Sequence, residues 1–191
     1  MLARDSKSAN FQSLIVSLNK RFPKAPKTSL IIISISEQKL YLFKDSKLTI
    51  SYKISSAKAG TGNLNGSFKT PLGVHKIAEK IGKGAKPATI FKARINTQEI
   101  AKILTNDNRS GEDNITSRIL RLRGLENGIN KGENIDSYER YIYIHGTDEE
   151  GLLGTPISHG CIRMGNQAVI ELFEQVETGT LLTIIEESLI I

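Results

Sequence analysis

The sequence is poor in cysteine, in aromatic residues and in long apolar runs. Cys161 is the single cysteine, so the chain cannot form an internal disulfide and does not require an oxidising compartment. Tryptophan is absent and aromatic residues make up 6% of the chain, which argues against a stacking platform for single-stranded nucleic acid. The longest apolar run near the start, residues 30–33, is far too short to cross a bilayer, so we expect no membrane partner.

The first ten residues also lack an apolar stretch of roughly 7–15 residues, which a secretory signal would need. We therefore expect a cytoplasmic protein, with the periplasm as the alternative if the sequence is a piece of a longer one. The net charge of +6 suits an anionic substrate or a nucleic acid, although a merely soluble basic protein would also carry it. No basic cluster or nucleic-acid motif accompanies this charge, so no nucleic acid is expected as a partner.

The hydrophobic pattern predicts a mainly β chain with helices near its two ends. Apolar residues at 11, 14, 15, 18 and 22 lie on one helical face, with Asn10 as a candidate N-cap. A second amphipathic helix is expected over residues 166–176, capped by Asn166, and a short one over residues 97–104. Strands are expected over residues 30–35, 39–44, 48–55, 74–78, 115–123, 141–144 and 181–185, with a turn at Asp45-Ser46. We expect two parts: an N-terminal helical appendage over residues 1–29 and a catalytic domain over residues 30–191.

The residues around Cys161 indicate a thiol nucleophile. Cys161 follows His159 and Gly160, and His145 lies sixteen positions upstream. A free thiol has a pKa of roughly 8.5 and needs a neighbouring base to supply the thiolate at neutral pH. Both histidines are candidate bases, and a turn at Gly160 could direct backbone N–H groups at one point, as an oxyanion hole requires. Arg163 has a planar donor fork that suits a substrate carboxylate.

Two other interpretations remain open from the residues alone. A lone cysteine is often a small buried hydrophobe, and each histidine taken singly is more often structural than catalytic. His145, His159 and Cys161 could also bind zinc, although no fourth ligand stands out and His75 is distant in the sequence. We expect catalysis with no metal and no cofactor.

The segment Ser158-His159-Gly160-Cys161-Ile162-Arg163-Met164, preceded by His145-Gly146-Thr147, resembles the catalytic signature of the YkuD-type L,D-transpeptidase family. That signature is a His, a spacer, Ser/Thr-His-Gly-Cys, a hydrophobic residue, and Asn or Arg. The resemblance extends through residues 69–73, 78–82, 141–145 and 169–173, and covers about residues 30–185. It leaves the N-terminal segment unexplained.

The resemblance implies a β-sandwich with one helix after the cysteine turn, and a thioacyl-enzyme formed on a peptidoglycan stem peptide. It implies Cys161 as the nucleophile and His145 as the general base, supported by the backbone carbonyl of Gly146. His159 and Gly160 would then shape the pocket and the oxyanion hole, and we assign Ser158 and Arg163 to substrate binding. The expected partners are stem peptides or muropeptides, and the sequence leaves the oligomeric state open.

The acceptor is not fixed by these residues. Water would give an L,D-carboxypeptidase that trims a tetrapeptide to a tripeptide in muropeptide recycling, which is the activity we expect from the cytoplasmic location. An amine from a second stem would give an L,D-transpeptidase that cross-links the wall. A non-catalytic binding module for peptidoglycan fragments is the alternative from another class, although such a module would need neither Cys161 nor His145.

Overall fold

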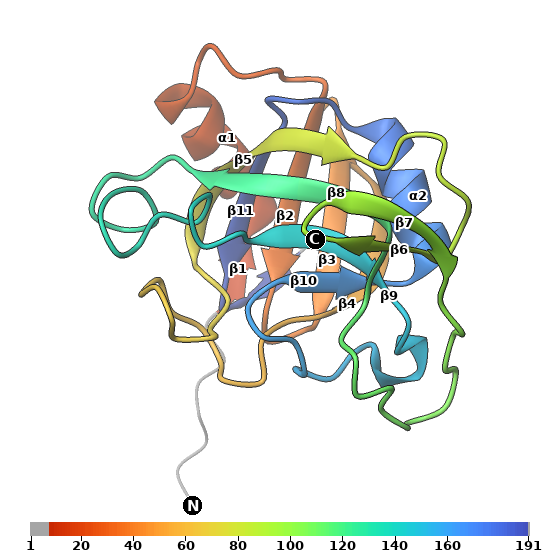
Figure 1. Ribbon diagram of the computed structural model, residues 1–191. Coiled ribbons are helices and arrows are strands. Elements are labelled where there is room, and N and C mark those ends of the chain that lie inside the picture. The colour runs from red at the N-terminus through yellow and green to blue at the C-terminus, as the bar shows by residue number, and fades with distance from the viewer. Residues whose placement is uncertain (1–7, 191) are drawn as a thin grey trace, which may run out of the picture.

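The computed structural model describes residues 8–190, and its chain is mainly β (Figure 1). The strands are β1 (Ser8–Asn10), β2 (Ser29–Ser34), β3 (Lys39–Lys44), β4 (Lys47–Ser55), β5 (Gly73–Ile81), β6 (Thr89–Lys92), β7 (Ile95–Ile100), β8 (Ile115–Gly124), β9 (Tyr143–Thr147), β10 (Ile162–Met164), β11 (Leu181–Ile185) and β12 (Ser188–Ile190). The helices are α1 (Phe11–Arg21), the short 3-10 turn η1 (Glu150–Leu152) and α2 (Asn166–Gln175). None of the described helices is long and apolar enough to cross a membrane.

Ten of the strands form one mixed sheet that closes on itself. Its order is β5-β11-β2-β3-β4-β10-β9-β8-β6-β7, and a further pairing joins β5 to β8. Most neighbours are antiparallel, but β11 lies parallel to β2 and β10 lies parallel to β9. The prediction of a mainly β, sandwich-like domain is confirmed.

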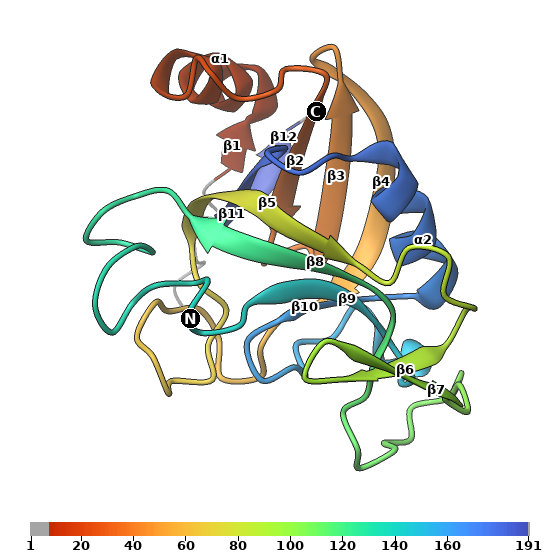
Figure 2. The same cartoon turned by 45° about the horizontal axis from the view of Figure 1, so that its top comes forward.

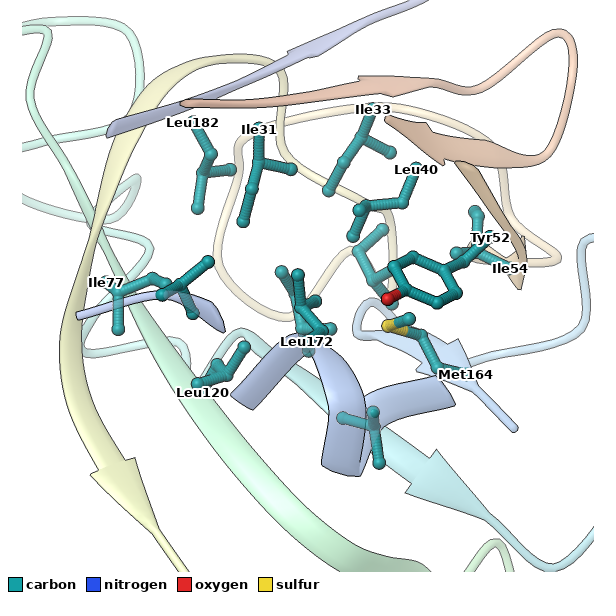
Figure 3. Packing of buried hydrophobic residues seen from close by; sticks show 14 of the residues in the cluster. Ile31, Ile33, Leu40, Tyr52, Ile54, Ile77, Leu120, Met164, Leu172 and Leu182 are labelled. Atoms are coloured by element: carbon teal, nitrogen blue, oxygen red, sulfur yellow. The ribbon is translucent and has the colours of Figure 1, made fainter. Parts of the chain in front are cut away.

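The core lies inside the closed sheet and is filled by α2. Ile31 and Ile33 of β2 point inward and pack in one cluster with Leu172 and Phe173 of α2. Figure 3 shows Leu172 in the middle of this cluster, surrounded by side chains from several strands. The two faces of β2 alternate, as the pleat requires, so Ile32 points outward and belongs to a second cluster with Ile15 of α1.

Helix α1 covers the outer face of β2 and β3, on the side of the sheet away from α2 (Figure 2). The expected N-cap is confirmed, because Asn10 Oδ1 accepts hydrogen bonds from Gln12 N at 2.9 Å and from Ser13 N at 3.2 Å. The Phe11 ring stacks on Phe43 of β3 with the ring centroids 5.2 Å apart. The predicted appendage therefore packs on the sheet. Its first seven residues, and residue 191 of the predicted catalytic domain, lie outside the described part, so the boundary at residue 29 stays a prediction.

The helix predicted near the C-terminus is confirmed as α2, but its cap is not Asn166. Gly165 occupies the N-cap position and Asn166 is the first helical residue. The Asn166 side chain turns into the protein, where its Oδ1 accepts from Thr116 Oγ1 at 2.7 Å and its Nδ2 donates to Thr147 O at 2.8 Å. Asn166 thus joins the start of α2 to β8 and β9 and does not satisfy the amides of its own helix.

The helix predicted over residues 97–104 is wrong, because this stretch begins as β7 and continues without regular structure. Gln98 has a φ of +66°, which breaks a right-handed helix, and its N–H donates to Asn96 Oδ1 at 2.7 Å. Thr97 Oγ1 donates to Ile90 O of β6 at 2.9 Å. The segment therefore forms a hairpin with β6.

The seven predicted strands are present, with small shifts at their ends. The turn at Asp45-Ser46 is also confirmed, since both residues have positive φ, as a tight hairpin turn between β3 and β4 requires. Strand β9 begins at Tyr143 and not at residue 141, because Tyr141 has a φ of +55°. Four short strands escaped the sequence pattern, namely β1, β6, β10 and β12, each of three or four residues.

Candidate active site

A parallel strand pair brings the two sequence motifs together. Cys161 directly precedes β10, and β10 pairs with β9, which carries His145. The two strands lie side by side (Figure 1), and their register places Arg163 opposite His145. Because the strands are parallel and in this register, the thiol and the His145 imidazole open into the same cavity.

The Cys161 thiol is held by backbone groups of the neighbouring chain. Tyr143 N donates to Sγ at 3.4 Å, and Sγ is 3.5 Å from Tyr141 O, to which the S–H can donate. Burial raises the pKa of the thiol to about 11, although the Tyr143 N–H and the positive charge of Arg163 favour the thiolate. At neutral pH the resting group is therefore a neutral thiol.

His145 is buried in β9, and its hydrogen bond determines its tautomer. Nδ1 lies 2.7 Å from Gly146 O, and since a carbonyl oxygen only accepts, Nδ1 must carry the hydrogen. Nε2 then keeps its lone pair and can accept a proton. Burial lowers the pKa of His145 to about 4, so the imidazole is neutral across the physiological range.

The thiol and the imidazole share a cavity of about 90 Å³. Its lining residues are Asp113, Ile115, His145, Ser158, His159, Cys161 and Arg163. No hydrogen bond joins Sγ to the His145 ring in this arrangement, because Sγ faces the backbone of Tyr141 and Tyr143 instead. The direct thiol–imidazole contact expected from the sequence therefore stays a prediction.

Ser158 and Gly160 form the turn that presents the thiol. Ser158 is buried, and its Oγ donates to Cys161 O at 2.6 Å. Ser158 Oγ also accepts a hydrogen bond from Gly160 N at 3.2 Å. Gly160 has a φ of +131°, a conformation that favours glycine. The Ser158 hydroxyl thus holds the turn from inside. The expected contact of Ser158 with substrate stays a prediction, as does the role of Gly160 N–H as an oxyanion donor. In this structure the Gly160 N–H donates to the Ser158 hydroxyl.

His159 lines the thiol cavity and is largely exposed at its surface. Its side chain is 65% exposed, and its Nδ1 lies 2.6 Å from Asp113 Oδ2. Burial alone would raise the pKa of Asp113, but the Arg163 guanidinium and the His159 ring outweigh it and hold that pKa below its ordinary value. Asp113 is therefore an anion that links His159 to the wall of the cavity.

The Arg163 guanidinium has two carboxylate partners within the protein itself. Nη1 donates to Glu149 Oε2 at 2.7 Å, and Nη2 donates to Asp113 Oδ1. Arg163 is almost completely buried, and its Nε is buried without a hydrogen-bond partner among the described residues. The substrate-carboxylate role assigned to Arg163 stays a prediction, but these contacts give it the role of a buried ion-pair partner.

Sequence reasoning missed both partners of Arg163. Glu149 lies only four residues after His145, in the run Asp148-Glu149-Glu150, so a search for acids near the histidine could have found it. Asp113 lies in a polar loop that carries no local signal, and only the fold brings it to the cavity.

No group of three His, Cys, Asp or Glu side chains suited to a metal ion occurs within residues 8–190. His75, the third histidine, is distant in the sequence from the other candidate zinc ligands and is fully buried. Its Nδ1 lies 3.0 Å from Gly73 O, and its Nε2 lies 2.9 Å from Ser137 Oγ. Both of its nitrogens are thus engaged in structural hydrogen bonds.

Sequence comparison finds relatives among known proteins. The chain is 29% identical over 177 residues to the probable L,D-transpeptidase YcfS of Escherichia coli, a match that covers 90% of this chain and 48% of that protein. It is 42% identical over 48 residues to the probable L,D-transpeptidase YbiS of Escherichia coli, covering 25% of this chain and 16% of that protein. The chain thus spans about half the length of YcfS.

Structure comparison agrees on the fold. A crystal structure of an L,D-transpeptidase from Mycobacterium tuberculosis matches with a TM-score of 0.52 and 14% identity, covering 83% of this chain and 58% of that one. One from Xylanimonas cellulosilytica matches with a TM-score of 0.50 and 17% identity, covering 85% and 63%. The model of the YkuD family, the L,D-transpeptidase catalytic domain, matches residues 28–185. This chain belongs to the YkuD family of L,D-transpeptidase catalytic domains.

Proposed function

We propose that this protein is a cysteine-dependent L,D-acyltransferase that acts on peptidoglycan stem peptides through a thioacyl intermediate on Cys161. One observation carries the proposal: the single thiol of the chain opens into the same cavity as a buried histidine whose tautomer leaves Nε2 free to accept a proton. A pure binding module would need neither group. The names of the relatives, all L,D-transpeptidases, support the substrate class.

The charge states of the two groups define the first chemical step. Because the thiol pKa is raised to about 11 and the His145 pKa is lowered to about 4, the resting pair is neutral. When substrate enters, the Cys161 side chain turns toward His145, the S–H proton passes to Nε2, and sulfur bonds to the substrate carbonyl carbon. The resulting imidazolium is stabilised by its Nδ1–H bond to Gly146 O.

The tetrahedral intermediate then collapses to the thioester. The C–N bond breaks, and the leaving amine of the terminal D-amino acid takes the proton back from His145. We assign the oxyanion to the Cys161 N–H, since Gly160 N already donates to Ser158 Oγ. Deacylation repeats these steps, with His145 taking the proton of the acceptor.

We further propose water as the main acceptor, which makes the enzyme an L,D-carboxypeptidase that trims tetrapeptide to tripeptide. The cavity of about 90 Å³ at the thiol, lined in part by the ion-paired Asp113, His159 and Arg163, has room for a water molecule. Soluble muropeptides in the cytoplasm would be the donors for this activity, and cell fractionation tests that location.

The test is incubation with a purified tetrapeptide muropeptide, with and without a second stem as amine donor, read by mass spectrometry. We expect the tripeptide product in both mixtures, no product from the Cys161→Ala variant, and no loss on adding a chelator. Wild-type turnover by Cys161→Ala would refute the nucleophile assignment. Cross-linked dimers as the main product, or recovery of the protein in the periplasm, would instead favour wall cross-linking, the activity that the names of the relatives indicate.

A further inference from the structure

A second, larger groove adjoins the cavity of the thiol. Its volume is about 460 Å³, and it shares Ser158 and His159 with the thiol cavity. Its other walls include Phe68, Ile157, Lys58 and Arg109. A chain that lay in this groove would continue past His159 to Cys161.

Backbone contacts fix one wall of the groove to the cysteine turn. Lys58 N donates to Ser158 O at 3.0 Å, and Ala57 forms a parallel bridge with Ser158. The Phe68 ring packs edge-on against the His159 ring at a centroid distance of 6.2 Å. Lys58 and Phe68 are thus held in place relative to the thiol.

The part of the wall that carries Arg109 is anchored by the network around Arg163. Arg109 precedes Ser110, whose N–H donates to Glu149 Oε1 at 2.8 Å. Glu149 also binds Arg163, so the segment that carries Arg109 is fastened to the buried ion pairs beneath the thiol cavity.

The groove carries positive charge that the protein does not neutralise. Lys58 and Arg109 are exposed, and neither forms an ion pair or a side-chain hydrogen bond with any residue in the described range 8–190. Arg163, by contrast, is neutralised by two carboxylates and buried. Lys58 and Arg109 are therefore cations of the groove without a carboxylate partner in the described part of the chain. Phe68, which is 62% exposed, adds an apolar surface to the groove beside His159.

We propose that this groove binds a carboxylate-bearing segment of the donor peptide, adjacent to the bond that Cys161 attacks, with Lys58 and Arg109 as its ion-pair partners. The inference rests on the proposed function, because it takes the groove as part of the acyl-donor path. It moves recognition of the substrate carboxylate from Arg163 to residues that a ligand can reach. The ligand class is an anionic peptide with an apolar portion for Phe68.

The test uses the full chain with two synthetic tetrapeptide stems. One stem has free carboxylates, and in the other the carboxylates that are not next to the scissile bond are amidated. Exposed ion pairs of this kind contribute modestly, so Lys58→Gln and Arg109→Gln should each raise KM for the acidic stem by about threefold, and the double variant by about tenfold. Neither should change kcat or the KM for the amidated stem. Lys47→Gln, exposed at the tip of the β3–β4 hairpin, removes the same charge elsewhere and should leave both KM values unchanged.

Binding without turnover separates this inference from the proposed function. In a Cys161→Ala background, isothermal titration with the acidic stem should show Kd rising about tenfold when Lys58 and Arg109 are both replaced, as expected for two exposed pairs. An equal Kd with and without the two substitutions would overturn the groove assignment even if turnover depends on Cys161. Turnover that persists without Cys161 would instead overturn the proposed function.

Discussion

The guanidinium of Arg163 donates to the carboxylate of Glu149 at 2.7 Å, and both side chains are almost completely buried, with 2% and 4% of their side-chain surface exposed. Arg163 lines the thiol cavity and lies on β10, the strand that follows the cysteine turn. An arginine that sequence alone suggested for substrate binding is therefore part of the framework that holds the site.

Replacing Arg163 should lower the stability of the fold more than it lowers the affinity for substrate. Arg163→Met leaves Glu149 and Asp113 without their cation, and breaking a buried pair in this way typically costs about 3–5 kcal/mol of the free energy of unfolding. Arg163→Lys keeps the charge but cannot serve both carboxylates from a planar fork, so its loss should be smaller. Urea unfolding measures both. A variant Arg163→Lys with wild-type stability and a raised KM for the muropeptide would restore the substrate-binding role.

The thiol should react slowly with alkylating reagents at neutral pH. Because its pKa is raised to about 11, the thiolate is scarce at pH 7 and grows about tenfold with each pH unit. The rate constant for iodoacetamide should therefore rise steadily from pH 7 to pH 9, well below that of a free cysteine peptide measured in parallel. A rate that is flat across this range would indicate a preformed thiolate–imidazolium pair.

The acid limit of turnover should reflect His145 in its buried state. The base must be neutral, and burial lowers its pKa to about 4 from an ordinary 6.5. The acid limb of kcat/KM should thus have its midpoint near pH 4, provided circular dichroism shows the protein still folded there. A midpoint at the ordinary histidine value would mean that His145 is solvated in the working enzyme. His145→Gln should lose most turnover, since glutamine cannot take the proton.

The buried His75 makes the fold sensitive to acid. Burial lowers its pKa to about 4 in the folded chain, against 6.5 when exposed, so the unfolded chain binds the proton first as the pH falls. The contribution of His75 to stability is fully present above pH 6.5 and is lost between pH 6.5 and pH 4, by an amount on the order of 3 kcal/mol, and the buried His145 adds a loss of the same sign. His75→Gln should lower stability at pH 7 but flatten this part of the curve. An unchanged slope in denaturant titrations would contradict the assignment.

Helix α1 should contribute to stability through its buried face. Ile15 is 5% exposed and packs with Ile32 and Phe43, so Ile15→Ala should cost about 2–4 kcal/mol. Val16, the next residue, is 67% exposed, and Val16→Ala should change stability by less than about 0.5 kcal/mol. Thermal unfolding of the two variants compares them directly. Equal effects would mean that the helix is not docked in solution.

Long elements with a regular pattern were predictable from the sequence. β3 and β11 have the predicted bounds, and α1 begins after its predicted cap, because each pattern repeats over enough residues to be distinguished from chance. A helix was wrongly predicted over residues 97–104, because polar residues with helix propensity pair here with β6 as part of β7. Strand β10, only three residues long, has no period to detect, although it positions the thiol.

The sequence by itself determined the family and predicted the nucleophile and its candidate base, because those depend on residue types at short spacings. Only the tertiary structure decided what surrounds them. The parallel pairing of β9 and β10 brings His145 beside the cysteine turn, and Asp113 arrives from a loop fifty residues away to neutralise Arg163. Whether a charged side chain faces the substrate or another side chain depends on burial and on partners distant in the chain, and no local spacing encodes either.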